Sequence, residues 1–201
     1  MTATNRRKFY LVRHGETHLN AEGRIRGLLD VPLTERGWAE ADAVGVALVP
    51  AHPVRVVTGP LARARETAGA IAEHTGAPVV VDDRYVDRDY GRWSGQIRSE
   101  VIAQWGSVDD APGVEPVGDV VTRCTSVLEE QMAYPEDGPI VLVGHDATNR
   151  ALLAALFPEL GPAEGIPQRT ACWNLVESDG TNWRLLLLDQ KPGDPVPEAA
   201  R

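Results

Sequence analysis

Three short apolar runs constrain the fold of this chain more than any other feature. They span Lys8 to Val12, Val54 to Val57 and Ile140 to Val143, and each is rich in aliphatic residues. Continuous apolar runs of this length are typical of strands buried on both faces. The three runs therefore predict a parallel sheet.

Charged and imidazole side chains stand where these runs end. The first run is followed by Arg13, His14 and Gly15, the last by His145, and the middle run leads into a segment that holds Arg63. One Arg-His pair after a strand is usually incidental, but three strand ends carry such residues here. Open α/β sheets bind ligands outside the carboxyl ends of their strands. We therefore expect Arg13, His14, Arg63 and His145 to form one cationic pocket.

Between the predicted strands, apolar residues recur at helical spacing, which predicts helices there. Thr34 is predicted to cap a helix that reaches about Val49 and buries Trp38, and a second helix runs from Pro60 to Gly76. Asp146 is the expected cap of the helix after the third run. Further predicted helices are Gln96–Trp105, Asp119–Met132 and Ala147–Leu156, and further predicted strands are Val79–Val81, Ala171–Val176 and Trp183–Leu188.

Length and composition favour a single domain. The chain has 201 residues, 43% of them hydrophobic, which is enough for one sizeable core. We predict a domain over residues 1–189, with a lid insertion over about 82–135. Residues 190–201, rich in Pro, Glu and Ala, are predicted to be a disordered tail.

The net charge of −9 argues against nucleic-acid or anionic-membrane partners, which need clustered Lys and Arg. We find neither a signal-peptide core nor a membrane span, so a cytoplasmic protein with a small-molecule partner is expected. Monomer and homodimer both stay open.

Cofactor and metal chemistry have little support in the sequence. Cys124 and Cys172 stand far apart, outside any Cys-x-x-Cys pattern, so neither a disulfide framework nor structural zinc is expected. His14 and His18 are four residues apart, but the strand and Gly15 argue against a helix there. We predict no metal and no cofactor.

A pocket of two arginines and two histidines suits a phosphoryl group, whose oxygens guanidinium groups bind in bidentate fashion. A neutral imidazole attacks phosphorus directly, and nearby arginines lower the pKa of a histidine. Departure of an alcohol also needs an acid. The sequence alone leaves five carboxylates open for that role, namely Glu16, Asp83, Asp87, Asp89 and Asp146.

Residues 11–17 read Leu-Val-Arg-His-Gly-Glu-Thr and are followed by Asn20. This resembles the signature of the histidine phosphatase superfamily, in its phosphoglycerate mutase-like branch. The similarity extends to Asp189, through Arg24–Thr34, Pro60–Ala68, Tyr90–Gly95 and Val143–His145.

The resemblance implies a three-layer α/β/α sandwich with a mostly parallel central sheet. It implies that His14 becomes phosphorylated and that water then releases phosphate without a metal. Arg13, Arg63 and His145 would hold the phosphoryl oxygens, and Asn20 would add a hydrogen bond. The expected substrate-binding residues are Asn20, Arg26, Gly27 and Arg92, with Arg98 and Arg169 as further candidates.

Two positions depart from the branch. Asp87 stands where the branch usually has a glutamate proton donor, and Asp146 stands after His145 where a glycine is usual. A His-Asp pair is similar to the acid-phosphatase branch, in which that aspartate gives the proton. Because the surrounding motifs match the first branch, we predict Asp87 as the donor, with Asp146 as the alternative.

The predicted function is hydrolysis of a small phosphomonoester through a phosphohistidine. The alternatives are a phosphoglycerate mutase, although mutases of this type are generally longer, and a non-catalytic protein that binds a phosphorylated ligand. The physiological phosphoester is left open by the sequence.

Overall fold

A computed structural model describes residues 6–194 of the chain. The strands are β1 (Arg7–Arg13), β2 (Arg55–Thr58), β3 (Val79–Val81), β4 (Ile140–Gly144), β5 (Trp173–Ser178) and β6 (Trp183–Gln190). The α-helices are α1 (His18–Ala21), α2 (Glu35–Leu48), α3 (Ala62–Thr75), α4 (Arg98–Trp105), α5 (Val117–Met132) and α6 (Asp146–Leu156). Five 3-10 turns join them: η1 (Val49–Ala51), η2 (Asp83–Tyr85), η3 (Gly91–Trp93), η4 (Pro158–Leu160) and η5 (Ala163–Gly165).

The strands form one six-stranded sheet in the order β3-β2-β4-β1-β5-β6. Strand β4 pairs in parallel with both β1 and β2, and β2 pairs in parallel with β3. Strand β5 runs antiparallel to both β1 and β6. The predicted mostly parallel sheet is confirmed, with its two antiparallel strands at one edge.

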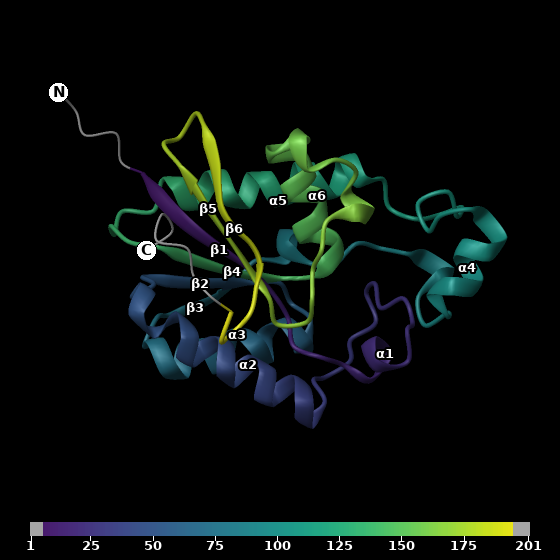
Figure 1. The fold of residues 1–201 in the computed structure, drawn as a ribbon, viewed down its shortest axis with the longest axis horizontal. Helices are drawn as coiled ribbons and strands as arrows, with labels where there is room; N and C mark the ends of the chain where they lie inside the picture. The colour runs from purple at the N-terminus through teal and green to yellow at the C-terminus, as the bar shows by residue number, and fades with distance from the viewer. Residues whose placement is uncertain (1–5, 195–201) are drawn as a thin grey trace.

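Helices cover both faces of the sheet (Figure 1). On one side α5 and α6 pack against a core that includes Leu11 and Leu142. On the other side α2 and α3 pack against a second core that includes Val12 and Val143. Neighbouring residues of one strand thus serve opposite cores, which explains why these runs are apolar throughout. The predicted three-layer α/β/α sandwich is confirmed.

Helix α2 begins after Thr34, whose side chain accepts a hydrogen bond from the Gly37 amide as predicted for a cap. The prediction that Trp38 lies in the core is wrong, because its side chain is 47% exposed. Gly37 occupies the buried position instead, where a Cβ would lie 2.1 Å from the carbonyl oxygen of Glu16. This close approach sets the rotation of the helix and turns Trp38 outward.

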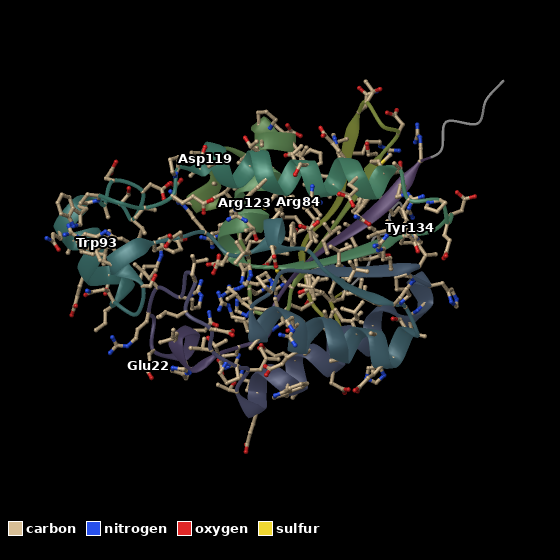
Figure 2. The ribbon with its side chains drawn as sticks, turned by 180° about the vertical axis from the view of Figure 1, so that it is seen from behind. Glu22, Arg84, Trp93, Asp119, Arg123 and Tyr134 are labelled. Atoms are coloured by element: carbon tan, nitrogen blue, oxygen red, sulfur yellow. The ribbon has the colours of Figure 1, made fainter. Side chains whose placement is uncertain are left out.

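The predicted lid at 82–135 extends too far toward the carboxyl terminus. Helix α5 is part of the sandwich, since Val120 and Leu128 lie in the same core cluster as Leu11. The projecting part, which we call the cap, comprises residues 90–114. Its own small apolar cluster joins Ile25, Trp93, Val101, Val108 and Ala111. Figures 1 and 2 show α4 and Trp93 in this projection, beyond the sheet.

The predicted disordered tail begins too early. Gln190 is the last residue of β6, and the Lys191 amide donates to the Asp194 carboxylate in the turn that follows. Residues 195–201 of the predicted tail lie outside the described residues. Within residues 6–194, no helix has the length and apolar character needed to cross a membrane.

Candidate active site

The parallel register of β1 and β4 places two histidines side by side. Arg13 pairs with Gly144, so His14 and His145 leave the two strand ends together. Their rings lie 5.2 Å apart between centroids, and both side chains are fully buried. A Cβ on residue 15 would lie 2.3 Å from the Gly37 carbonyl oxygen. Gly15 therefore lets the backbone after His14 pack directly against the start of helix α2.

The ring of His14 is held in one tautomer. Its Nδ1 lies 2.6 Å from the Gly15 carbonyl oxygen, which can only accept, so Nδ1 carries the proton. Its Nε2 is buried and has no hydrogen-bond partner within the described part of the chain. Burial, followed by the charges of Arg63 and Arg13, lowers the pKa of His14 well below its usual value. A neutral imidazole with a free Nε2 lone pair results.

His145 completes the imidazole pair from the N-cap position of α6, directly before the helix. Its Nδ1 lies 3.6 Å from Oδ2 of Asp87, and neither ring nitrogen has a hydrogen-bond partner within residues 6–194. Burial, the charge of Arg63 and the neighbouring His14 lower the pKa of His145. His145, not Asp146, is the N-cap residue of α6, and Thr148 accepts from its backbone amide. The predicted capping role of Asp146 is therefore wrong.

Arg63 is fully buried and firmly oriented. Its guanidinium donates to the carbonyl oxygens of Leu29 at 2.7 Å and Gly27 at 2.8 Å, and to Oδ2 of Asp87 at 2.9 Å. Its Nε stays without a partner among the described residues. Gly27, a predicted substrate-binding residue, thus contributes its backbone carbonyl, which accepts a hydrogen bond from Arg63 and orients that guanidinium.

Arg13 projects from the end of β1 and donates to the Gln168 carbonyl oxygen. The side-chain amide of Gln168 accepts a hydrogen bond from Asn149 and donates one to Asn174, and all three side chains are buried. This polar network supports Arg13 from the side of β5. The Nε of Arg13 has no hydrogen-bond partner in the part of the chain that the structure describes. Sequence reasoning missed the network.

Arg26 enters the site from the loop after α1. Its Nη2 donates to Oδ1 of Asp146 at 2.5 Å, and the two side chains are only 13% and 20% exposed. Burial alone would raise the pKa of Asp146, but the charges of Arg26, Arg13 and Arg150 lower it well below its usual value. Asp146 is therefore an ionised partner of Arg26.

Asp87 has the opposite protonation tendency. It is 1% exposed, and burial raises its pKa despite the lowering effect of Arg63, while the negative charge of Asp146 adds to the rise. Its position is fixed by Arg123 on α5, which donates to the Asp87 carbonyl at 3.0 Å and to that of Val86 at 2.6 Å. Arg123 also donates to the carbonyl of Arg84, its neighbour in Figure 2.

The other three carboxylate candidates lie elsewhere. Glu16 accepts from Thr34 and pairs with Arg36 at 3.3 Å, whereas Asp83 and Asp89 are exposed. Only Asp87 and Asp146 stand beside the paired histidines.

The remaining predicted residues divide into those near the site and those outside it. The Asn20 side-chain oxygen accepts a hydrogen bond from the backbone amide of Thr17, the N-cap residue of helix α1. Arg92 was predicted to bind substrate, but it is exposed and stacks on Trp93 at 4.6 Å, because its short 3-10 turn faces outward in the cap. Arg169 pairs with Asp189, and Arg98 lines a pocket that Arg26 and Asp146 also line.

Within residues 6–194, no three His, Cys, Asp or Glu side chains lie together as a potential metal site. Cys124 and Cys172 are both buried and free.

A match to a known protein family identifies the family of this chain. Residues 9–191 match the family profile of the histidine phosphatase superfamily, branch 1. The chain belongs to the histidine phosphatase superfamily. The prediction of a histidine phosphatase, made from the sequence motifs, is confirmed in both family and enzyme class.

Three relatives illustrate the range of this histidine phosphatase's family. Phosphoserine phosphatase 1 of Hydrogenobacter thermophilus is 33% identical over 160 residues, 75% of this chain and 76% of the relative. A 2,3-bisphosphoglycerate-dependent phosphoglycerate mutase 2 of Gloeobacter violaceus is 36% identical over 162 residues, covering 73% and 74%. A mycobacterial glucosyl-3-phosphoglycerate phosphatase, solved with VO3, superposes with a TM-score of 0.80 at 31% identity, covering 92% of this chain and 100% of that one.

Proposed function

We propose that this histidine phosphatase hydrolyses a small phosphomonoester through a phosphohistidine on His14. One observation carries the proposal: His14 Nε2 is buried and unpartnered in the described structure, while Nδ1 is held by the Gly15 carbonyl. A nucleophile that stays neutral and oriented at neutral pH meets the requirement for attack on phosphorus.

In the first step, the lone pair of His14 Nε2 forms a bond to phosphorus. The bond between phosphorus and the leaving oxygen breaks, and that oxygen takes a proton from the Asp87 carboxyl. Arg13, Arg63 and His145 bind the non-bridging oxygens, with Arg26 beside them. Their fixed donors stabilise the negative charge that the equatorial oxygens carry in the transition state.

In the second step, a water oxygen attacks phosphorus and the bond to Nε2 breaks, which returns the electron pair to His14. The Asp87 carboxylate left by the first step takes the proton of the water. Phosphate leaves, and His14 and Asp87 regain their starting protonation states.

Asp87 is the better proton donor of the two aspartates. Its pKa is raised, so it holds a proton more readily than an ordinary carboxyl group, whereas the pKa of Asp146 is lowered by Arg26 and its neighbours. A dianionic phosphoryl group beside Asp87 would raise its pKa further. We assign Asp146 to positioning Arg26.

A phosphoglycerate mutase is the second candidate, since a mutase stands among the relatives. In a mutase the phosphohistidine returns its phosphoryl group to the bound product instead of to water. Measuring phosphate release and 3-phosphoglycerate isomerisation on one preparation separates the two. Isomerisation faster than hydrolysis would assign this chain to the mutases.

The test of the nucleophile is His14→Ala, with His18→Ala as the matched control. His18 is exposed in α1, four residues from His14. We expect His14→Ala to abolish hydrolysis of an aryl phosphate and His18→Ala to retain it. Wild-type turnover in His14→Ala would overturn the mechanism. Absence of turnover in the wild type, with phosphate still bound, would support the non-catalytic alternative.

A further inference from the structure

One short segment binds the main chain of both Arg13 and His14. It comprises residues 168–172, between η5 and β5, and we call it the brace. The Arg13 amide donates to the Cys172 carbonyl at 2.9 Å, and the Ala171 amide donates to the His14 carbonyl at 3.1 Å. The brace therefore holds the end of β1, where the nucleophile and its neighbouring arginine stand.

The brace also orients the side chain of Arg13, because the Gln168 carbonyl accepts from its guanidinium. The Gln168 side chain donates to Oδ1 of Asn174 at 2.9 Å and accepts from its Nδ2 at 3.0 Å. Asn149 on α6 donates to the same Gln168 oxygen at 3.1 Å. Hydrogen bonds between buried groups are strengthened by the low local dielectric. This buried network holds Gln168, and through its carbonyl Arg13, in one place.

A carboxylate on α2 joins the brace to the segment that follows His14. The Thr170 hydroxyl donates to Oε1 of Glu40 at 3.0 Å, and the Glu16 amide donates to Oε2 of the same carboxylate at 3.0 Å. The Glu40 side chain is only 11% exposed. Glu40 therefore ties both sides of the nucleophile's backbone to one helix.

The backbone beside these contacts departs from ordinary geometry. Ala171 and Asp189 have φ values of 52° and 49°, in the left-handed region that residues with a side chain seldom adopt. The Asp189 carboxylate accepts from the amide and from Nε of Arg169, each at 2.7 Å, and the Asp189 amide donates to Asn174 at 2.9 Å. Such conformations persist where surrounding contacts over-determine them, and they cluster at functional sites.

We infer that the side chains of Gln168, Asn174 and Thr170 are positioning residues of the phosphoryl site. They act through Arg13 and His14 and do not contact the substrate. The inference rests on the proposed function, because it assigns their effect to the transition state of attack by His14. In that state the phosphoryl group is bonded to Nε2 and is unable to follow a displaced guanidinium, whereas free phosphate shifts to regain its contacts. A loosened brace should therefore weaken binding of the transition state more than binding of phosphate.

Thr170→Val tests the inference with little effect on folding, because it removes a hydroxyl and keeps the shape of a half-buried side chain. The probes are inorganic phosphate and vanadate, which takes up the trigonal bipyramidal geometry of the transition state. We expect the Kd of vanadate to rise roughly tenfold and that of phosphate less than about threefold, as for a hydrogen bond to a charged group. Thr170→Ser should restore vanadate binding. Thr75→Val is the matched control, since Thr75 is also half-buried and its hydroxyl donates within α3, at the opposite end from Arg63.

Asn174→Ala perturbs the buried network directly. Its matched control is Ser178→Ala, which changes a buried polar residue at the other end of β5. We expect Asn174→Ala to show the same selective loss of vanadate binding and to lower kcat for an aryl phosphate about tenfold or more. The kcat is expressed per phosphate-binding site, counted by calorimetry. A residue that only stabilises the fold would reduce the number of sites and leave the kcat of each site unchanged.

The outcomes separate this inference from the proposed function. If the wild type hydrolyses the aryl phosphate through His14 but neither variant loses vanadate binding selectively, only the inference fails. A selective loss in Asn174→Ala alone would remove Thr170 from the positioning residues, and if Asn174→Ala does not fold, Thr170→Val decides. If the wild type hydrolyses no ester and binds vanadate no more tightly than phosphate, the proposed function fails and the inference with it.

Discussion

Replacing Asp87 by Asn removes a proton and leaves the shape of the site nearly unchanged. The Asp87 carboxylate accepts from Arg63 at 2.9 Å and from the Arg88 amide at 2.9 Å, and an amide oxygen can keep one of these bonds. The side chain is 1% exposed, so water has little access to replace it as an acid. We therefore expect Asp87→Asn to fold and to lose proton donation specifically.

The size of the effect depends on the leaving group. Positioned acids contribute roughly 10²- to 10⁴-fold to a rate. We expect Asp87→Asn to lower kcat/KM by about that factor for an alkyl phosphate, whose alkoxide is a poor leaving group. An aryl phosphate with an acidic phenol needs little protonation, so its kcat/KM should fall less than about tenfold.

The assay is kcat/KM across a series of phosphate esters, plotted against the pKa of the leaving alcohol or phenol. The wild type should give a shallow slope and Asp87→Asn a steep negative one. Asp146→Asn is the control: because Asp146 holds Arg26, its loss should lower all rates by a similar factor. A steep slope in Asp146→Asn and a shallow one in Asp87→Asn would refute our assignment of the donor.

Three further predictions concern pH and packing. For alkyl esters, kcat/KM should fall as the pH rises through the raised pKa of Asp87, because the carboxyl group then loses the proton that it donates. It should not fall as the pH drops below about 6.5, because the pKa of His14 lies well below this usual histidine value. A loss of kcat/KM on acidification near pH 6.5 would contradict this prediction. Burial keeps His14 and His145 neutral in the folded protein, so below pH about 6.5 the unfolded chain binds more protons than the folded one. The free energy of unfolding should therefore fall by up to about 1.4 kcal/mol for each histidine and each unit that the pH drops. Urea unfolding at pH 7 and 5.5 measures it, and equal stabilities would count against neutral histidines. Gly15→Ala should cost about 1–3 kcal/mol in the same assay, since its Cβ meets the Gly37 carbonyl; an unchanged midpoint would disprove that clash.

The strand ends were predictable from the sequence because each is a local pattern. An apolar run that stops at Arg13-His14 or at His145 marks both a buried strand and its carboxyl end. Parallel pairing then brings the two ends together without further information. The neutral, oriented state of His14 follows from the same placement.

Pairings between distant segments were not predictable in this way. Asp146 meets Arg26 across 120 positions of sequence. The sequence offers it as a helix cap and as the alternative proton donor, and neither role points to Arg26. Trp38 fitted the helical stripe, but the approach of Gly37 to Glu16 turned it outward. Arg150 had a local signal, since it follows Asp146 by one helical turn on the same face of α6.

Trapping the intermediate tests the central claim most directly. The enzyme is mixed with a ³²P-labelled ester and quenched within a turnover, and the labelled residue is mapped by peptide analysis. We predict one acid-labile, base-stable phosphoryl group on His14, present in Asp87→Asn with an aryl ester and absent in His14→Ala. Turnover without label on His14, or label retained in His14→Ala, would contradict the account.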